Sequence, residues 1–159
     1  MKQITYSLTD HEPIIDFILR PSSKFAETLE GLGKPVPKPV KVRGLVDTGF
    51  SGGLFIDQSL VKGWGLITRN FNQVSSLRPD DGRIYHTYAW EVTVSIKFES
   101  EASDVQNILI DPIPATLVEF ADIKQTAALI GREILQATTF LYDGTKQSFT
   151  IDFSDSFVV

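Results

Sequence analysis

Residues 84–98 read Ile84-Tyr85-His86-Thr87-Tyr88-Ala89-Trp90-Glu91-Val92-Thr93-Val94-Ser95-Ile96-Lys97-Phe98 and carry the strongest period in the chain. Large apolar residues occupy one parity: Ile84, Tyr88, Trp90, Val92, Val94, Ile96 and Phe98. The other parity is mostly polar. Every second side chain of a β-strand shares a face, so this pattern predicts one long strand with its apolar face toward a core.

A turn signal precedes this strand. Pro79-Asp80-Asp81-Gly82 combines the residue types that favour tight turns. A strand of this length can leave such a turn as an exposed hairpin arm and then enter a buried sheet. We therefore predict a flap over residues 78–88 that is mobile without ligand, because its turn is polar.

The rest of the chain also favours β structure. Apolar runs bounded by polar or breaker residues predict strands at Pro13–Leu19, Val42–Val46, Gly53–Ile56 and Ile108–Ile110, and a hairpin of Thr138–Tyr142 with Gln147–Phe153 around Asp143-Gly144. Caps and glycines predict two short helices, Asp57–Trp64 and Arg132–Ala137. Residues 21–39 contain so many glycines and prolines that we expect a mobile surface loop. The prediction is an all-β, closed antiparallel barrel-like lobe with one or two short helices, in a single domain of residues 1–159.

Composition limits the possible functions. A length of 159 residues suits one core, and a net charge of −5 disfavours a nucleic-acid partner. The absence of cysteine excludes thiolate catalysis and sulfur-bound zinc. No signal peptide or membrane-length apolar segment is evident, so we expect a cytoplasmic protein with no membrane partner. His11-Glu12 lacks the second histidine of a helical zinc motif, and we expect neither metal nor cofactor.

The main candidate for a catalytic segment is Gly44-Leu45-Val46-Asp47-Thr48-Gly49-Phe50-Ser51-Gly52-Gly53. It places an acidic residue between the end of an apolar strand and a glycine-rich turn. Backbone donors in such a turn can hydrogen-bond a carboxylate, and glycines let a substrate or a second chain approach closely. Further along, Ala128-Leu129-Ile130-Gly131-Arg132-Glu133-Ile134-Leu135 is a second apolar strand that meets a glycine and opens a helix. The two segments in this order are far more specific than Asp-Thr-Gly alone.

Taken together, these segments resemble the retroviral-type aspartic proteases, the retropepsins, and above all their bacterial single-lobe relatives. The shared features are two apolar residues before Asp-Thr-Gly, a flap hairpin, an apolar-apolar-Gly-Arg segment and a short helix. The resemblance covers about Lys41–Phe153. It implies a barrel-like lobe, peptide-bond hydrolysis without a metal, and an active site shared across a two-fold axis.

The resemblance also implies residue roles. Asp47 is the expected catalytic acid, Thr48 braces the two loops of a dimer, and Gly49 contacts substrate. Gly131 is expected beneath the catalytic loop, and Arg132 supports that loop. The expected substrate contacts are Gly49, Phe50, Ser51, Gly82, Arg83 and Ile84.

Two departures from the family pattern concern substrate range and dimer strength. Phe50 replaces a small residue and narrows or reshapes the central subsites. Ser51 stands where retroviral members place an acid, so Arg132 needs another partner.

The mechanism requires two carboxylates in unequal protonation states. The chain contains one Asp-Thr-Gly triplet, so a second copy is the economical source of the second acid. The prediction is a homodimeric aspartic endopeptidase acting on peptides or proteins.

Three plainer interpretations remain open. The chain could be a catalytically silent dimerisation or peptide-binding module of the same fold, which Phe50 favours. It could instead be an unrelated ligand-binding barrel. Residue by residue, Asp47 could be a turn former, Thr48 a local hydrogen-bonding hydroxyl and Arg132 a surface charge.

Overall fold

The computed structural model describes residues 2–68, 71–77, 84–99, 107–119 and 126–154. The elements in chain order are β1 (Lys2–Ser7), β2 (Ile14–Pro21), α1 (Ser23–Gly31), β3 (Val40–Val46), β4 (Leu54–Asp57), the 3-10 turn η1 (Gln58–Val61), β5 (Phe71–Leu77), β6 (Ile84–Phe98), β7 (Ile108–Val118), β8 (Ala128–Ile130), α2 (Arg132–Leu135), β9 (Thr138–Asp143) and β10 (Ser148–Phe153). The chain is mostly β-strand, as its alternating sequence predicted.

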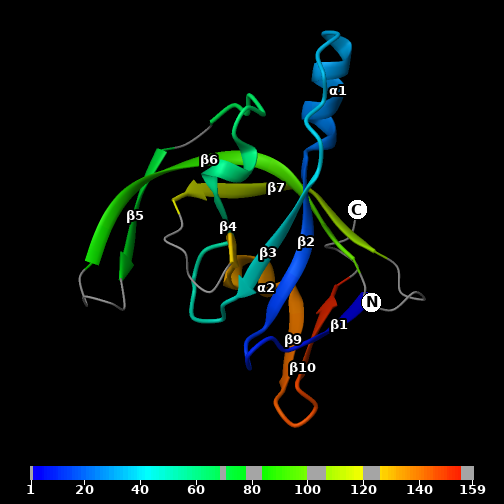
Figure 1. Cartoon of the computed structure of the whole chain (residues 1–159), viewed down its shortest axis with the longest axis vertical. Helices are drawn as coiled ribbons and strands as arrows, with labels where there is room; N and C mark the ends of the chain where they lie inside the picture. Colours follow the sequence, from blue (N-terminus) through cyan, green and yellow to red (C-terminus); the bar gives the residue numbers. More distant parts are fainter. Residues whose placement is uncertain (1, 69–70, 78–83, 100–106, 120–125, 155–159) are drawn as a thin grey trace.

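Six strands close into a barrel (Figure 1). They follow the order β2-β3-β8-β4-β7-β6, and β6 pairs back with β2 so that Phe17 lies opposite Phe98. The pairs are antiparallel except β3–β8 and β4–β7, which are parallel. Each of these six strands is paired on both edges, so backbone hydrogen bonds hold the barrel together around its whole circumference.

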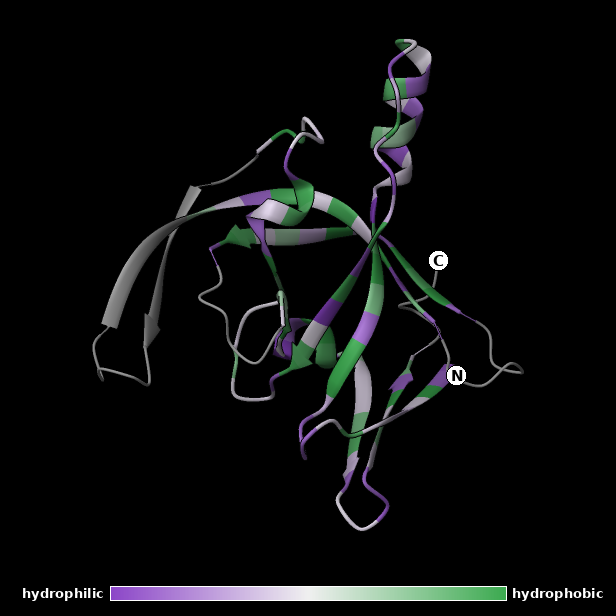
Figure 2. Cartoon of the chain, in the orientation of Figure 1, coloured by the Kyte–Doolittle hydropathy of each residue, from purple (hydrophilic) through white to green (hydrophobic). Residues whose placement is uncertain are grey.

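The barrel shares one apolar core with a three-stranded sheet of order β1-β10-β9. Green apolar bands alternate with purple polar ones along the strands in Figure 2, as expected when one face of each strand is buried. Phe98 joins the two parts, because its ring packs 5.9 Å from that of Phe17 and 5.5 Å from that of Phe153. Gly44 of β3 makes room here, since a Cβ on it would lie 3.0 Å from the Phe17 ring.

The predicted hairpin arm is present. β5 pairs antiparallel with the first half of β6, from Phe71 opposite Trp90 to Leu77 opposite Ile84, and the arm extends to one side of the barrel (Figure 1). Its turn, residues 78–83, lies outside the described residues, so the predicted flap mobility stays a prediction. One detail of the alternation is wrong: Trp90 is 43% exposed and Ala89 is fully buried instead. The even-numbered residues of β6 therefore face the core only from Val92 onward, where β6 enters the barrel wall.

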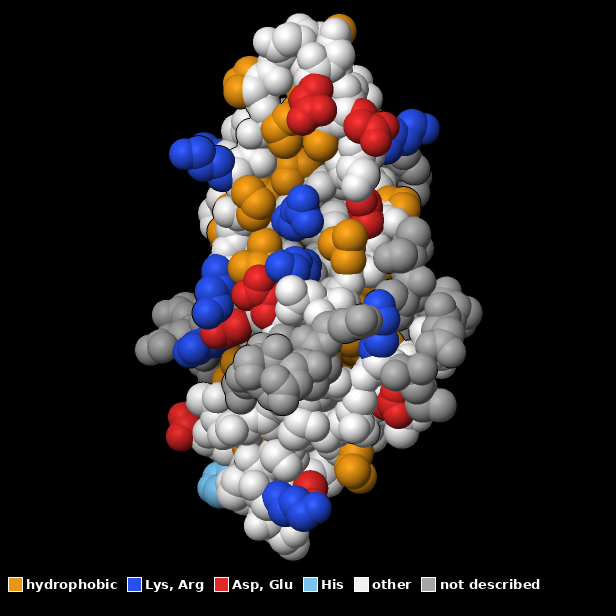
Figure 3. Space-filling view, turned by 90° about the vertical axis from the view of Figure 1, so that its right-hand side faces the viewer, with side chains coloured by type: hydrophobic (Ala, Val, Ile, Leu, Met, Phe, Trp, Pro, Cys, Tyr) orange, Lys and Arg blue, Asp and Glu red, His pale blue; other side chains and the backbone are white. Residues whose placement is uncertain are grey.

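The prediction of an irregular loop over residues 21–39 is wrong for its first part. Residues Ser23–Gly31 form α1, and Ser22 caps it by accepting a hydrogen bond from the Phe25 N–H. The glycines and prolines lie after this helix, and the chain returns beside it as an extended segment (Figure 1). No residue of α1 is buried. In Figure 3 apolar side chains gather near the top, where α1 lies, and acidic and basic side chains adjoin one another below.

The other differences are in length. The helix expected at Asp57–Trp64 is only the 3-10 turn η1, capped by Asp57, because Gly63 and Gly65 take positive φ. The strand expected at Ile108–Ile110 continues to Val118. β1 and β5 were not predicted. In the part of the chain that the structure describes, no helix has the length and apolar character needed to cross a bilayer.

Candidate functional site

The loop of residues 47–53 crosses one end of β8. β8 lies between β3 and β4 in the barrel, so Val46 and Leu54 both pair with Ile130, the last residue of β8. The loop that joins β3 to β4 must therefore pass over the next residue, Gly131. This topology brings together the two sequence segments that predicted the site (Figure 1).

Asp47 is the first residue after β3 and is half-buried. Its N–H donates to the Ile130 carbonyl at 3.0 Å, which continues the strand pairing by one residue. Its Oδ1 accepts the Gly49 N–H at 2.8 Å, and its carbonyl accepts the Phe50 N–H at 3.2 Å. These bonds fix the carboxylate within a tight turn. Among the described residues its other oxygen, Oδ2, has no hydrogen-bond partner, so it is available to accept a hydrogen bond from another molecule.

The first turn of α2 fastens this loop. The N–H groups of Gly131, Arg132 and Glu133 donate to the carbonyls of Gly53, Phe50 and Gly52, at 2.8, 2.9 and 3.1 Å respectively. The first N–H groups of a helix have no partner inside it and otherwise need a cap. Here the loop carbonyls supply the cap, so helix and loop satisfy each other.

Gly131 allows this close approach. A Cβ on Gly131 would overlap the Gly52 carbonyl oxygen and the Phe50 ring. Its φ of −104° is open to any residue, so the need for glycine at this position is steric and not conformational. Gly131 thus lies directly against the loop that carries Asp47.

Phe50 packs against Phe55 of the neighbouring strand β4. Its ring meets Phe55 of β4 edge-on, with 4.5 Å between the ring centroids, and it leaves no space for a side chain on Gly52. The ring therefore supports the turn from the β4 side. Thr48, Gly49 and Ser51 are exposed on the same loop, where another molecule can reach them.

Arg132 contributes through its main chain only. Its side chain is exposed and has no hydrogen bond or ion pair within the described ranges. The Thr48 hydroxyl likewise has no partner there. The structure thus brings Asp47, Gly49, Phe50, Gly131 and Arg132 together. Of the expected hairpin contacts, Gly82 and Arg83 lie outside the described residues, and Ile84 opens β6 without a described side chain.

Sequence reasoning missed three contributors to the site. Phe55 holds the Phe50 ring, and the carbonyls of Gly52 and Gly53 cap α2. The glycine pair just before a strand was a usable signal, because two adjacent residues without side chains indicate close packing of another segment. Phe55 gave no comparable signal.

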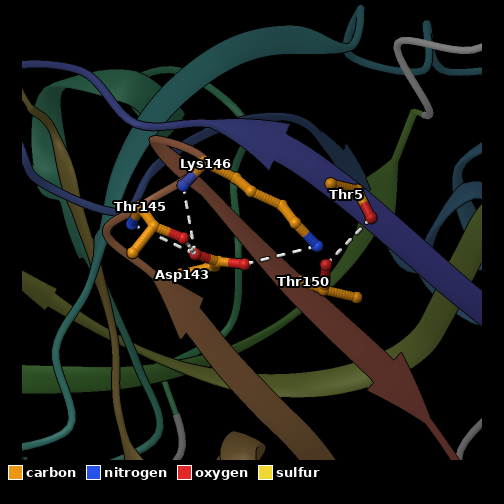
Figure 4. Close-up of polar contacts among 5 residues, drawn as sticks. All are labelled: Thr5, Asp143, Thr145, Lys146 and Thr150. Carbon is orange, nitrogen blue, oxygen red and sulfur yellow. Dashed lines mark hydrogen bonds and ion pairs between the residues drawn. The ribbon is translucent and has the colours of Figure 1, made fainter.

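A separate polar cluster lies at the β9–β10 turn (Figure 4). The Asp143 carboxylate accepts the Thr145 hydroxyl at 2.6 Å and the N–H groups of Thr145 and Lys146, each at 3.1 Å, and it pairs with the Lys146 ammonium at 3.5 Å. The Thr145 hydroxyl first, and then the Lys146 N–H, lower the pKa of Asp143. Beside it the hydroxyls of Thr5 and Thr150 lie 2.9 Å apart. Asp143 contacts only residues of its own turn, and the Thr5–Thr150 contact joins β1 to β10, so these contacts support the sheet and do not form a second site.

His11 does not add to the site. Beyond β1, the carbonyl of His11 accepts the Tyr142 hydroxyl at 2.9 Å, and the side chain of His86 is not described. Within the described ranges no group of three or more His, Asp or Glu side chains could hold a metal ion.

Comparisons of the chain with protein-family models, with curated proteins and with solved structures found no match.

Proposed function

We propose that the chain is one subunit of a homodimeric aspartic endopeptidase, with Asp47 as the catalytic acid. The observation that carries the proposal is the state of the Asp47 carboxylate. One oxygen is held by the Gly49 N–H, and the other has no partner in the described chain. The loop around it is fastened to α2 at three main-chain positions. Such fixation is what a positioned acid or base needs.

The chemistry calls for a second carboxylate. One acid must be ionised to take a proton from the attacking water while the other, protonated, hydrogen-bonds the scissile carbonyl. The first then passes the proton to the leaving nitrogen, and the C–N bond breaks. In the proposed dimer a second copy supplies the second Asp47 across a two-fold axis, with the exposed Thr48 and Gly49 next to it.

The proposed substrate is an extended peptide between the 47–53 loop and the β5–β6 arm. Gly49 and Ser51 are exposed, and Phe50 shapes the floor between them. The arm is continuous with the barrel through strand β6, and the described part of the arm, β5 with the first half of β6, is the proposed second wall of the peptide site. We propose a cytoplasmic setting and no metal or cofactor.

One observation favours a second function, a catalytically silent peptide-binding or dimerisation module. The Arg132 side chain has no partner among the described residues, so the ionic brace that the resemblance implies is missing there. The Phe50 ring instead packs on Phe55 and takes part of the space at the loop.

The test compares wild type with Asp47→Asn, which keeps the shape and the bond from the Gly49 N–H. Sedimentation should show a dimer for both proteins. We expect wild type to cleave a peptide library with an activity maximum in pH, and Asp47→Asn to lose activity by several orders of magnitude. Asp10→Asn, the same change at an exposed carboxylate outside the loop, is the matched control and should leave cleavage unchanged.

Each outcome has a definite meaning. Equal cleavage by wild type and Asp47→Asn would reject Asp47 as the catalytic acid. A monomer that cleaves peptides would reject the shared site. A dimer that binds peptides but never cleaves them would replace the peptidase by the silent module.

A further inference from the structure

A cavity of about 670 Å³ lies between β7, β4 and α2. Its walls are mainly apolar and consist of Leu54, Ile110, Pro112, Ile113, Pro114 and Ile134. Cavities of this size and lining are the usual sites for small molecules in proteins. Asp47 and the exposed loop residues Thr48, Gly49 and Ser51 do not line this cavity.

The polar groups of the cavity carry one sign of charge. Asp111 and Glu133 line it together with Gln136, and none of its described lining residues is basic. The Asp111 carboxylate accepts hydrogen bonds from the N–H and hydroxyl of Ser23 at the start of α1, and it has no ion pair with a described basic residue. Glu133 has no side-chain hydrogen bond or ion pair in the described part of the chain.

Glycine at position 53 helps to place Glu133. The Oε2 atom of Glu133 lies 3.0 Å from the point that a Cβ on Gly53 would occupy. The carboxylate therefore lies over bare backbone at the edge of an apolar cavity. A cation with an apolar body would satisfy both features, because its charge would meet the carboxylate while its carbon chain would cover the apolar wall.

We propose that the cavity between β7 and α2 binds a small organic cation, a primary ammonium group on a short alkyl chain. The proposal rests on the cavity and its charge and does not depend on peptidase activity. A second cavity, of about 310 Å³, gives an internal comparison. It is lined by Lys41 and Arg43 as well as Asp16 and Glu99, so its charges balance and it should not select cations.

A bound cation would also contact residues whose hydrogen bonds hold the 47–53 loop against α2. Gly53 accepts the Gly131 N–H, and Glu133 donates its N–H to Gly52, so two of the three bonds between α2 and the loop involve residues that line the cavity. Binding should slow hydrogen exchange at the amides of Gly131 and Glu133, because opening of the loop would then require loss of the ligand.

The experiment is a titration of the isotope-labelled full chain with hexylammonium, followed by amide NMR shifts at neutral pH. Hexan-1-ol and hexanoate have the same chain with no charge and with the opposite charge. We expect hexylammonium to bind in the millimolar range with shifts at Gly53, Ile113 and Ile134, and the alcohol and the acid to bind at least several-fold more weakly. Glu133→Gln should raise the Kd for hexylammonium about two- to fivefold.

The matched control is Glu27→Gln, which makes the same change on exposed α1 and should leave the Kd unchanged. Equal binding of hexylammonium and hexan-1-ol would overturn the proposal, as would a Kd that Glu133→Gln does not raise. Shifts confined to the cavity lined by Lys41 and Arg43 would also overturn it.

Discussion

Replacing Gly131 by alanine tests the packing between α2 and the 47–53 loop. The new methyl group would overlap the Gly52 carbonyl oxygen and the Phe50 ring, so the loop must move away from the helix. Overpacking of this kind costs typically about 1–3 kcal/mol. Movement also stretches the hydrogen bonds from the N–H groups of Gly131 and of the first two residues of α2, each contributing about 1 kcal/mol. We expect a loss of about 3 kcal/mol in the free energy of unfolding.

The measurement is urea unfolding of wild type and Gly131→Ala at one protein concentration. In a thermal melt of the same two proteins, this loss should lower the melting temperature by about 6–12 °C, at about 2–4 °C per kcal/mol for a chain of this size. Gly31→Ala is the matched control, because a Cβ on Gly31 meets nothing within 4 Å and α1 is exposed. That variant should keep or slightly raise stability.

A loss below about 1 kcal/mol for Gly131→Ala would refute the argument, since it would mean that the loop yields without cost. An equal loss for Gly31→Ala would refute it too. In that case the effect would come from the backbone and not from the contact with Gly52 and Phe50.

Two further predictions concern the turn at Asp143 and the start of α1. Hydrogen bonds lower the pKa of Asp143 in the folded chain, so its carboxylate stabilises the fold at pH values above its unfolded pKa, and this contribution disappears as pH falls through the folded pKa. Asp143→Asn should therefore lower the melting temperature at neutral pH, and the difference from wild type should shrink below about pH 3.9 in a pH series of melting curves. A difference that grows in acid would contradict this. Ser22→Ala removes the acceptor of the Phe25 N–H and should weaken α1 by about 1 kcal/mol, seen as roughly fivefold faster hydrogen exchange at residues 25–29. Equally faster exchange in β3 would show that the helix is not an independent unit.

Alternation predicted the elements that have one buried face. The strand over Ile84–Phe98 was predicted with its full length, because its polar and apolar parities differ so clearly. β5 was missed because its sequence, Phe71-Asn72-Gln73-Val74-Ser75-Ser76-Leu77, spaces its apolar residues by three. β1 has only Ile4 and Tyr6 as buried apolar residues and gives too short a pattern.

Breaker residues account for two differences between the predicted and the observed elements. Pro112 and Pro114 suggested an end to β7, yet the strand passes through both. Pro112 lies where the pairing with β6 is irregular, between Val94 and Ile96, so its missing N–H is tolerated there, while Pro114 keeps the regular register opposite Thr93. The glycines and prolines after Gly31 hid a helix whose start was signalled by Ser22 as its cap.

Local patterns selected the two segments of the candidate site, and only the family resemblance implied that Gly131 lies beneath the loop that carries Asp47. The approach of the two segments follows from β8 lying between β3 and β4, which no local pattern reveals. The packing of Phe50 on Phe55 likewise depends on how the chain returns into β4.

The α1 arm is an insertion within a β-hairpin. Leu19 and Val40 already lie opposite each other on β2 and β3, so the chain between them leaves the barrel and comes back to the same point. Its side chains take no part in the core, and Ser23 with Asp111 ties only its base to the barrel. The barrel therefore places little constraint on the sequence of this arm, which can be lengthened, shortened or exchanged for another segment while the register of β2 and β3 is kept. Evolution or design can in this way give the molecule a new recognition element without altering the loop that carries Asp47.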